Sequence, residues 1–461
     1  MAASSTETSS GQIIDNPQKC RVRNNPAKRL ECAAFRRFGS SFFLEKPSQQ
    51  ADPIKSAGTR RTPNASRGSF TKSQIVVCIW IGLLSVFKLA GAEPGERTIT
   101  LEKTPNVSLR NEVKRAIEKG LDWLEKTQNT NGYWSTADHP AISALALAAF
   151  RMHTIGTQQD QEPSVVKKGY GYLLNCAQAD GGIYRKDLPS YNTSLALVAL
   201  VAGNRPEYQP LISKARKFLI GLQADYDEPG KVDNALDGGI GYGIKDKRPD
   251  LSNTALALEA LYLSKRSRSK PELVEENDLN WSAAIHFIQS CQNLPAHNSE
   301  TWASADPQNK GGFIYAPGRS MAGETNLGSG RVALRSYGSM SYAGLLSYIY
   351  ADLKRDDPRV TAVMNWLRAN FTLEENPGLG QQGLFYYYHT MAKALTLYGD
   401  AELETKAGES IRWREQLALK LINLQTVSGS WLNENGRWFE KDPALVTAYA
   451  LIALEMIQGK L

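Results

Sequence analysis

The stretch Lys119–Trp134, KGLDWLEKTQNTNGYW, decides the fold of this chain. Leu124 and Gln128 are four residues apart and share one helix face, so the leucine can be buried while the amide reaches a neighbouring backbone end. Gly132 permits the sharp reversal that ends such a helix. A very apolar segment follows from Ser143, and this serine is expected to accept an early backbone N–H as a helix cap. The pattern therefore predicts a helix pair joined by a glycine turn.

The same unit recurs six times within residues 105–461, and internal repetition of this kind sets a whole architecture. First helices such as residues 113–126 are amphipathic, whereas second helices such as residues 254–263 are apolar nearly all round. Six buried helices inside six half-exposed ones predict an all-α fold, an α6/α6 double-walled toroid, with an open stack of helix pairs as the alternative. The last-turn residues and second-helix openers are Gln128 and Ser143, Gln178 and Thr193, Gln223 and Thr254, Gln292 and Ser341, Phe371 and Thr390, and Gln425 and Thr447.

The region before the repeats has the composition of a targeting segment. Residues 1–72 are basic, rich in Ser, Asn and Pro, and without apolar periodicity, so we expect a disordered tail or an overcalled start site. Residues 73–92 combine a basic flank, the apolar run 75–87 and a small-x-small end, as a secretory signal peptide does. The run is shorter than the roughly 20 apolar residues of a membrane-spanning helix. We expect a cleaved signal and a periplasmic or secreted protein; an uncleaved signal anchor through 75–87 and a buried helix are the alternatives.

The net charge of +7 is confined to the N-terminal region. Residues 1–92 contain 14 Lys and Arg against 5 Asp and Glu, whereas residues 93–461 contain 40 against 42. Because the repeat region is nearly neutral, no nucleic-acid partner is expected. Five cysteines are too few for a disulfide-stapled scaffold, and Cys176 and Cys291 are interpreted as buried thiols or as one disulfide.

The spacing between paired helices indicates where a binding face lies. From Gln223 to Thr254 and from Gln292 to Ser341 the gaps are 31 and 49 residues, against 15 in the first two units. Insertions that collect on one face of a repeat array commonly form its binding face. The same rim receives the inner-helix N-termini, whose dipoles favour an anion or a partial negative charge. We therefore expect a site at this rim.

Two loops on this rim carry concentrated charge. Residues 318–339 are Gly-rich and hold Arg319, Arg331 and Arg335, which fit an anion contact or an ordinary surface loop. The third-unit loop is acidic and fits either a calcium site or a solvated loop. Its acidic residues are Asp225, Asp227, Glu228, Asp233 and Asp237.

The pattern K-G-x3-L-x3-Q-x3-G-x-W at Lys119–Trp134 resembles the QW motif of squalene and oxidosqualene cyclases. With the six-unit count, residues 105–461 resemble the terpenoid-cyclase/protein-prenyltransferase superfamily, which implies an α/α toroid around a hydrophobic cavity. Class II cyclases carry D-x-D-D-T-A, which reads Asp250-Leu251-Ser252-Asn253-Thr254-Ala255 in this chain. Ser252 occupies the position of the proton-donating Asp, and a hydroxyl is too weak an acid to protonate an alkene. We therefore expect no squalene-type protonation.

The zinc site of protein prenyltransferases is similarly incomplete. His389 falls on that family's His ligand, but Tyr337 and Ser339 fall on its Asp and Cys ligands. One imidazole with Tyr and Ser does not make a four-ligand zinc site, so we expect no metal and no cofactor. Arg331 falls where the family has a diphosphate-binding arginine.

Candidate catalytic residues are Asp250, His389 and Tyr388. His389 is interpreted as an acid/base or hydrogen-bond donor in a cavity, or as a capping or core histidine. Asp250 is interpreted as a cavity carboxylate or as a helix N-cap. The candidate ligand-binding residues are Asn192, Ser252, Asn253, Arg331, Arg335, Tyr337, Ser339 and Tyr386.

Three functions remain open on this sequence. The first is a protein that binds or transforms an apolar small molecule or lipid; as an enzyme it would be a divergent terpene-cyclase-like or prenyltransferase-like transferase or isomerase. The second is an exported binding or scaffold protein without catalysis. The third is a carbohydrate-active enzyme, since double-walled α barrels also host sugar hydrolases and lyases.

Overall fold

The computed structural model describes residues 106–153, 162–266, 278–328, 331–405 and 408–461. The basic tail 1–72 and the predicted signal 73–92 lie outside these residues. Within the described ranges, no helix combines the length and apolar character that a membrane crossing requires.

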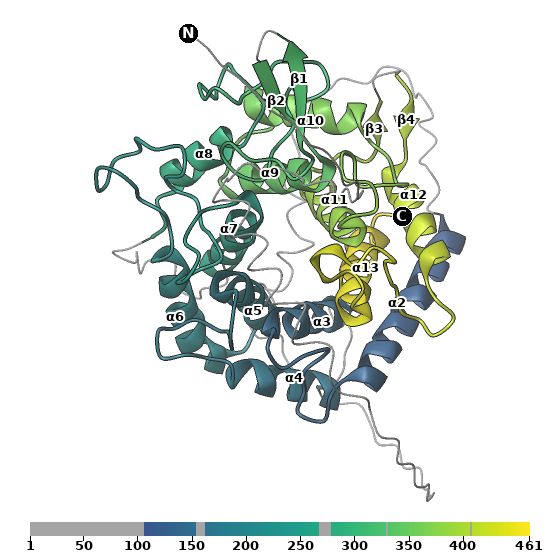
Figure 1. Cartoon of the computed structure of the whole chain (residues 1–461). Coiled ribbons are helices and arrows are strands. Elements are labelled where there is room, and N and C mark those ends of the chain that lie inside the picture. The colour runs from purple at the N-terminus through teal and green to yellow at the C-terminus, as the bar shows by residue number, and fades with distance from the viewer. Residues whose placement is uncertain (1–105, 154–161, 267–277, 329–330, 406–407) are drawn as a thin grey trace, which may run out of the picture. The chain divides into compact units, whose positions relative to one another are not determined.

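Helices dominate the described part of the chain, as predicted (Figure 1). It contains twelve α-helices, two short 3-10 turns and two antiparallel hairpins. The α-helices are α2 (Val107–Thr127), α3 (Pro140–His153), α4 (Ser164–Leu174), α5 (Pro189–Gly203), α6 (Gln209–Ile220), α7 (Leu251–Arg266), α8 (Trp281–Ser290), α9 (Gly338–Tyr350), α10 (Pro358–Ala369), α11 (Leu384–Tyr398), α12 (Trp413–Leu424) and α13 (Pro443–Gln458). The 3-10 turns are η4 (Pro206–Tyr208) and η5 (Arg437–Phe439).

Six of these helices form a closed ring. Helices α3, α5, α7, α9, α11 and α13 contact one another in chain order, and α13 returns to pack against α3. Figure 1 shows the six around a common centre, with α2, α4, α6, α8, α10 and α12 outside them. Helix α13 is buried nearly all round, whereas the buried residues of α2 recur every three or four positions on one face. Helices α13 and α2 thus show the predicted contrast between an apolar inner and an amphipathic outer helix.

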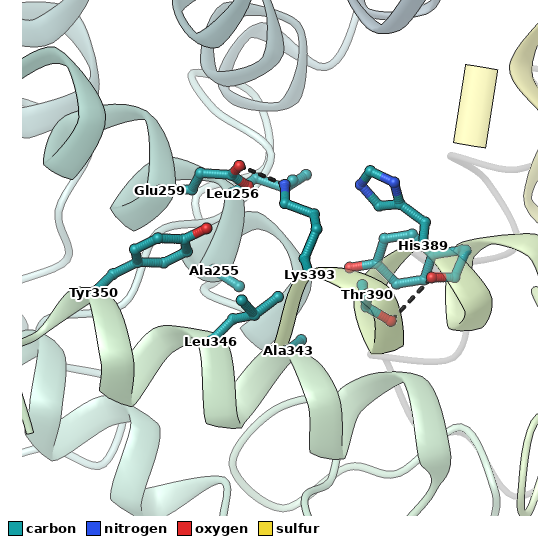
Figure 2. A pocket seen from close by; sticks show the side chains of 10 residues that line it. Ala255, Leu256, Glu259, Ala343, Leu346, Tyr350, His389, Thr390 and Lys393 are labelled. Atoms are coloured by element: carbon teal, nitrogen blue, oxygen red, sulfur yellow. Dashed lines mark hydrogen bonds and ion pairs between the residues drawn. The ribbon is translucent and has the colours of Figure 1, made fainter. Parts of the chain in front are cut away.

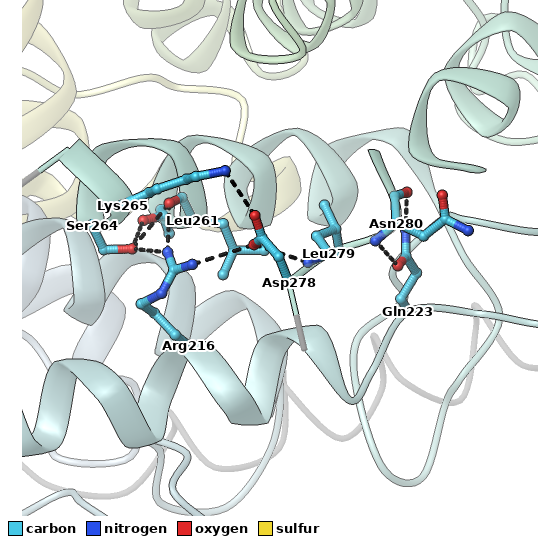
Figure 3. A network of polar contacts seen from close by, with 9 residues as sticks. Arg216, Gln223, Leu261, Ser264, Lys265, Asp278, Leu279 and Asn280 are labelled. Atoms are coloured by element: carbon cyan, nitrogen blue, oxygen red, sulfur yellow. Dashed lines mark hydrogen bonds and ion pairs between the residues drawn. The ribbon is translucent and has the colours of Figure 1, made fainter. Parts of the chain in front are cut away.

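Glutamines after the outer helices join consecutive helix pairs, as their position predicted. Gln128 Nε2 donates to Gly132 O in its own turn (3.1 Å) and to Val165 O in the next outer helix, α4 (2.8 Å). Gln223 exchanges two hydrogen bonds with the backbone of Asn280 at the start of α8, both 2.9 Å long (Figure 3). The amides of Gln292 and Gln425 reach Arg359 O and Ala116 O, whereas Gln178 stays within its own unit on Cys176 O and Tyr184 O.

A buried arginine ties the outer helix α6 to the inner helix α7. Arg216 donates to Leu261 O (2.6 Å) and to Ser264 Oγ (2.7 Å), and it pairs with Asp278 at 3.4 Å (Figure 3). Burying a guanidinium is costly unless its donors are satisfied, and these acceptors supply that compensation.

Glycine turns lie directly on the backbone of the next outer helix. Gly238 has φ +85°, and a Cβ there would lie 2.0 Å from Ala283 O in α8. The equivalent glycines face a carbonyl at 2.3–2.8 Å in the same way. These pairs are Gly132 with Lys168, Gly181 with Lys214, Gly311 with Ala362, and Gly429 with Lys119.

The predicted role of the Ser/Thr openers is wrong. Ser143 and four of its equivalents do not cap their helices; they lie near the helix start, and the hydroxyl oxygen accepts the N–H of a residue in the preceding turn. The sixth opener, Thr390, instead donates to Tyr386 O and Tyr387 O of its own helix. Ser143 Oγ accepts from Trp134 N at 3.1 Å. In the sequence, a hydroxyl near a helix start could either cap that helix or accept a hydrogen bond from another segment. In the structure, the glycine turn before the helix supplies the N–H donor. The other pairs are Ile183 with Thr193, Ile240 with Thr254, Phe313 with Ser341 and Trp431 with Thr447.

The fifth unit departs from this pattern. Phe371, where glutamine is expected, follows the end of α10, and Phe385 lies within α11 rather than in a turn. Tyr387 and Tyr388 of α11 donate instead to Thr372 O (2.9 Å) and Leu373 O (2.5 Å). In the unit that lacks the glutamine amide, two phenol hydroxyls therefore donate hydrogen bonds to the backbone carbonyls that follow α10.

Two further features differ from the sequence expectation or decide between its alternatives. The Gly-rich segment 318–339, expected as a loop, contains a hairpin of β1 (Glu324–Gly328) and β2 (Arg331–Leu334). A second hairpin joins β3 (Leu403–Glu404) and β4 (Ser410–Ile411).

Cys176 and Cys291 are buried free thiols, so the disulfide alternative is not realised.

We expect Gly238→Ala to destabilise the protein far more than Gly230→Ala. Both residues have positive φ, so each alanine carries a left-handed backbone cost of about 1–2 kcal/mol. At Gly230 the new methyl meets nothing within 4 Å, but at Gly238 it collides with the backbone of α8. Denaturant unfolding of the two variants measures the difference, and equal losses would contradict the glycine contact.

Candidate functional site

Helices α7, α9 and α11 enclose a small cavity on the inner side of the ring (Figure 2). Its free volume of about 10 Å³ corresponds to one water molecule. Six of its ten lining side chains are apolar or aromatic, and polar groups occupy the rest. The lining residues are Ala255, Leu256, Glu259, Ala343, Leu346, Tyr350, Tyr386, His389, Thr390 and Lys393.

A buried ion pair crosses this cavity. Lys393 of α11 donates to Glu259 of α7, and the two side chains are only 7% and 3% exposed. The Tyr350 hydroxyl points toward the same carboxylate (Figure 2). The pair links two inner helices that are not neighbours in the ring, since α9 packs between them. An ammonium and a carboxylate in an otherwise apolar interior are stable only because each neutralises the other.

His389, a predicted site residue, lines the cavity one helical turn before Lys393. Burial, and secondly the Lys393 ammonium, lowers the pKa of its imidazole well below the ordinary 6.5, so the ring is neutral at pH 7. Its ring centroid lies 5.0 Å from that of Tyr449, and its Nδ1 has no hydrogen-bond partner. A neutral imidazole with an unpartnered nitrogen can accept a hydrogen bond inside the cavity.

Tyrosines from three inner helices adjoin this group. Tyr386 of α11 packs against Tyr449 of α13, with ring centroids 5.9 Å apart. The Tyr449 hydroxyl is 3.1 Å from that of Tyr191 in α5. Ser252, in the first turn of α7, lies within hydrogen-bonding reach of Tyr386. Predicted residues Tyr386 and Ser252 therefore lie together, next to the cavity.

The residues of the inner helices that keep some solvent exposure mark the surface that faces the inside of the ring. On α5, α7, α11 and α13 the residues that are not fully buried recur three or four positions apart, which makes one stripe per helix. On α7 and α11 the stripe is the cavity lining, and the tyrosine contacts bring the stripes of α5 and α13 beside it. The stripes are Tyr191, Leu195 and Val198; Ala255, Leu256 and Glu259; Tyr386, His389 and Lys393; and Tyr449, Ile452 and Met456.

Asp250 is buried at the start of α7 and acts as its N-cap. Its Oδ1 accepts from Asn253 N at 2.9 Å, and its Oδ2 accepts from Asn253 Nδ2 at 2.7 Å. Burial raises the pKa of the carboxyl to about 6, although these bonds and Arg319 pull it down. Asn253 Oδ1 is left buried without a partner. Predicted residues Asp250 and Asn253 thus bond to each other.

The inner-helix N-termini, predicted to favour an anion, are occupied by protein groups. Asn192 Oδ1 accepts Ala141 N at the start of α3 (3.0 Å), and Asn376 Oδ1 accepts Ser339 N at the start of α9 (3.0 Å). At α11 the cap is Glu440, which accepts from Tyr386 N (2.7 Å) and Phe385 N (3.2 Å). Burial raises the pKa of Glu440 to about 7. Each of these helices is capped from a following unit.

Of the remaining predicted residues, Tyr337, Ser339, Tyr388 and Arg335 do not line the cavity. Tyr388 donates to Leu373 O and is absent from the cavity lining. Tyr337 is the buried N-cap residue of α9, and Ser339 Oγ accepts from Asn376 Nδ2. Arg331 belongs to strand β2, and Arg335 is an exposed residue just beyond it.

The described part of the chain has no cluster of three or more His, Cys, Asp or Glu side chains placed to hold a metal ion. In the acidic third-unit loop, Asp237 instead accepts the backbone N–H groups of Tyr226, Asp233 and Asn234 at 2.7–3.1 Å. The carboxylate closes the loop.

The cavity's ion pair was missed at the sequence level. Glu259 and Lys393 are lone charges inside otherwise apolar helices, and that isolation was the available signal. Their pairing spans 134 residues, so no local spacing pattern reveals it.

No family model matches the chain, and no curated protein is similar to it in sequence. Among solved structures, the ligand-free type II terpene cyclase MstE from Scytonema, as a single-residue variant, is 11% identical over 77% of this chain and 99% of its own, with a TM-score of 0.46. A D-mannose isomerase is 12% identical over 76% and 98%, with a TM-score of 0.48. A GH76 α-mannanase from Bacteroides thetaiotaomicron is 9% identical over 74% and 95%, with a TM-score of 0.46.

We expect Asp250→Asn to become relatively more stabilising as pH rises. The folded-state pKa of about 6 exceeds the ordinary 3.8, so the folded protein binds this proton more tightly than the unfolded chain. That contribution is complete below about pH 3.8 and is lost as pH rises through about 6, which costs the wild type up to about 3 kcal/mol. An Asn at position 250 keeps the cap and, after rotation of the neighbouring amide, can donate to Asn253 Oδ1.

Denaturant unfolding of both proteins at pH 4, 5, 6 and 8 measures this effect. The gain from Asp250→Asn should be larger at pH 8 than at pH 4, with the change centred between the two pKa values. A gain that does not vary with pH would mean that Asp250 has an ordinary acidity in the fold.

Proposed function

We propose that residues 105–461 form an α6/α6 double-walled toroid of six QW-like repeats that is exported and binds or transforms an apolar, isoprenoid-type ligand inside its ring. The proposal includes neither squalene protonation nor zinc. It is supported first by the closed ring of inner helices and by the glutamine and glycine contacts that join consecutive units.

The observation that carries the proposal is the composition of the inner stripes. Leu195, Val198, Leu256 and Ile452 are apolar, while the polar groups are concentrated around Lys393. Ligand sites are commonly apolar with a few convergent polar groups that fix orientation. An apolar chain lying along the stripes would place its polar end beside the ion pair.

These residues do not support the chemistry of the cyclases that the sequence resembles, or that of sugar hydrolases. Ser252, at the proton-donor position, lies beside a phenol rather than a carboxyl group. Asp250 and Glu440 are engaged as helix caps, and Glu259 is held by Lys393. Glu455 of α13 is the exception, because both of its buried carboxylate oxygens lack a hydrogen-bond partner. A pair of free, facing carboxylates of the kind that glycoside hydrolysis uses is therefore not favoured.

One observation favours the alternative of a non-catalytic binding or scaffold protein. The cavity between α7, α9 and α11 has room for a single water, so an isoprenoid chain would have to displace side chains there. In a scaffold, the same interior would be a packed core with a neutralised ion pair.

Lipid analysis of the purified full-length chain tests the proposal. We expect mass spectrometry of an organic extract to find one apolar class at near-stoichiometric amounts. Ala255→Leu, which adds volume to the lining, should reduce it, whereas Ala296→Leu on an exposed loop should not.

The other outcomes of this measurement are equally distinct. A folded protein that carries no lipid and takes up none supports the scaffold alternative, and bound glycans support a carbohydrate-active one. Stoichiometric zinc that disappears in His389→Ala would contradict the metal-free site.

Export is tested separately by N-terminal sequencing of the full-length product after expression and fractionation. We expect the mature chain in the extracytoplasmic fraction to begin near residue 93, after Ala90-Gly91-Ala92. The double variant Ala90→Arg/Ala92→Arg should remain a membrane-bound precursor, because signal cleavage needs small residues at these positions. A wild-type chain that stays uncleaved in the membrane would instead favour the signal anchor.

A further inference from the structure

The ion pair in the cavity is poorly explained by stability alone. Lys393 and Glu259 lose nearly all of their hydration, and such a pair is often no more stabilising than two apolar side chains of the same volume. The surrounding residues Leu256, Ala343 and Leu346 show that the site otherwise accepts apolar groups. A lysine kept at this position is therefore a candidate for chemistry.

We propose that Lys393 forms a Schiff base with an apolar aldehyde or ketone held in the ring, with Glu259 as the proton acceptor and then the counter-ion. The inference deepens the proposed function and rests on it, because it assumes an apolar ligand along the inner stripes. It names the functional group of that ligand, a carbonyl at the end or along the chain.

The protein supplies every proton that the reaction needs. The Lys393 ammonium gives a proton to the Glu259 carboxylate, with which it is already hydrogen-bonded. The free amine attacks the carbonyl carbon, forming the C–N bond, and the amine's proton passes to the carbonyl oxygen to give a carbinolamine. Glu259 then returns its proton to the hydroxyl, the C–O bond breaks and water leaves. The iminium nitrogen keeps one hydrogen and a positive charge opposite the restored carboxylate.

Two features of the cavity suit the loss of water, whereas the carbonyl end of the ligand has to displace side chains to reach Lys393. Its volume of about 10 Å³ matches the one water that is released. His389 Nδ1, buried and without a protein partner, is one helical turn from Lys393 and can accept a hydrogen bond from the carbinolamine hydroxyl or from the water. The positive charge is conserved, since an iminium replaces an ammonium, so the buried carboxylate stays neutralised throughout.

Reductive trapping on the full-length chain tests the proposal. The protein is incubated with farnesal and sodium cyanoborohydride at neutral pH, and labelled lysines are located by peptide mass spectrometry. We expect Lys393 to be labelled first and most completely, and farnesol, which has the same chain without a carbonyl, to slow that labelling. Lys393→Arg should abolish the main label, whereas Lys186→Arg, at a lysine on the exterior paired with Asp138, should leave it unchanged.

The outcomes separate this inference from the proposed function. Farnesol or farnesal bound without labelling of Lys393 overturns the Schiff base and leaves the apolar site standing. Labelling spread over exterior lysines and unchanged in Lys393→Arg also overturns it, and absence of any binding sinks both proposals. Thermal melts check the fold of each variant; if Lys393→Arg does not fold, the order of labelling of Lys393 and Lys186 in the wild type still decides.

Discussion

The glycine turn that lies on the backbone of the next outer helix is the constraint on which this structure depends. At Gly238 and its four equivalents there is no space for a Cβ, because a carbonyl of the following outer helix fills that position. Four glutamine amides then bond across the same junction and hold two backbones in register. The last of these junctions, Gly429 and Gln425 against α2, joins the sixth unit to the first. A short-range contact repeated around the array thus closes the ring.

The N-termini of the inner helices are capped by side chains of the protein itself. Three inner helices, α3, α9 and α11, are capped from the following unit by Asn192, Asn376 and Glu440. Helices α7 and α13 are capped by Asp250 and Asp442, which directly precede them. These caps occupy N–H groups that would otherwise be open to an anion. The cavity-lining residues His389 and Lys393 lie one and two turns further along α11.

Local patterns in the sequence predicted the helical character of the fold and the contacts between neighbouring helix pairs, because these depend on residues close together in the sequence. Gln128 and Gly132 act within one turn and one neighbouring helix, so their spacing is informative. Ser143 was misjudged because a hydroxyl near a helix start serves equally as a cap or as an acceptor for the returning turn. The cavity was beyond such reasoning, since Glu259 and Lys393 meet only after the ring has closed. Side-chain partners far apart in sequence depend on the closed geometry rather than on any periodicity.

The free-energy cost of burying charged side chains among apolar ones makes the ion pair of the interior unusual. An inner helix gains most from residues such as Leu256 and Leu346, which bury apolar surface at no electrostatic cost. Placing Glu259 and Lys393 among them requires desolvation of two ions, which their mutual attraction offsets but does not clearly exceed. At the start of α7, the Ser252 hydroxyl lies within hydrogen-bonding reach of the Tyr386 phenol, and the Asp250 carboxylate is used as a helix cap. The polar groups that face the cavity therefore come from the middle of α7 and α11 rather than from the helix starts.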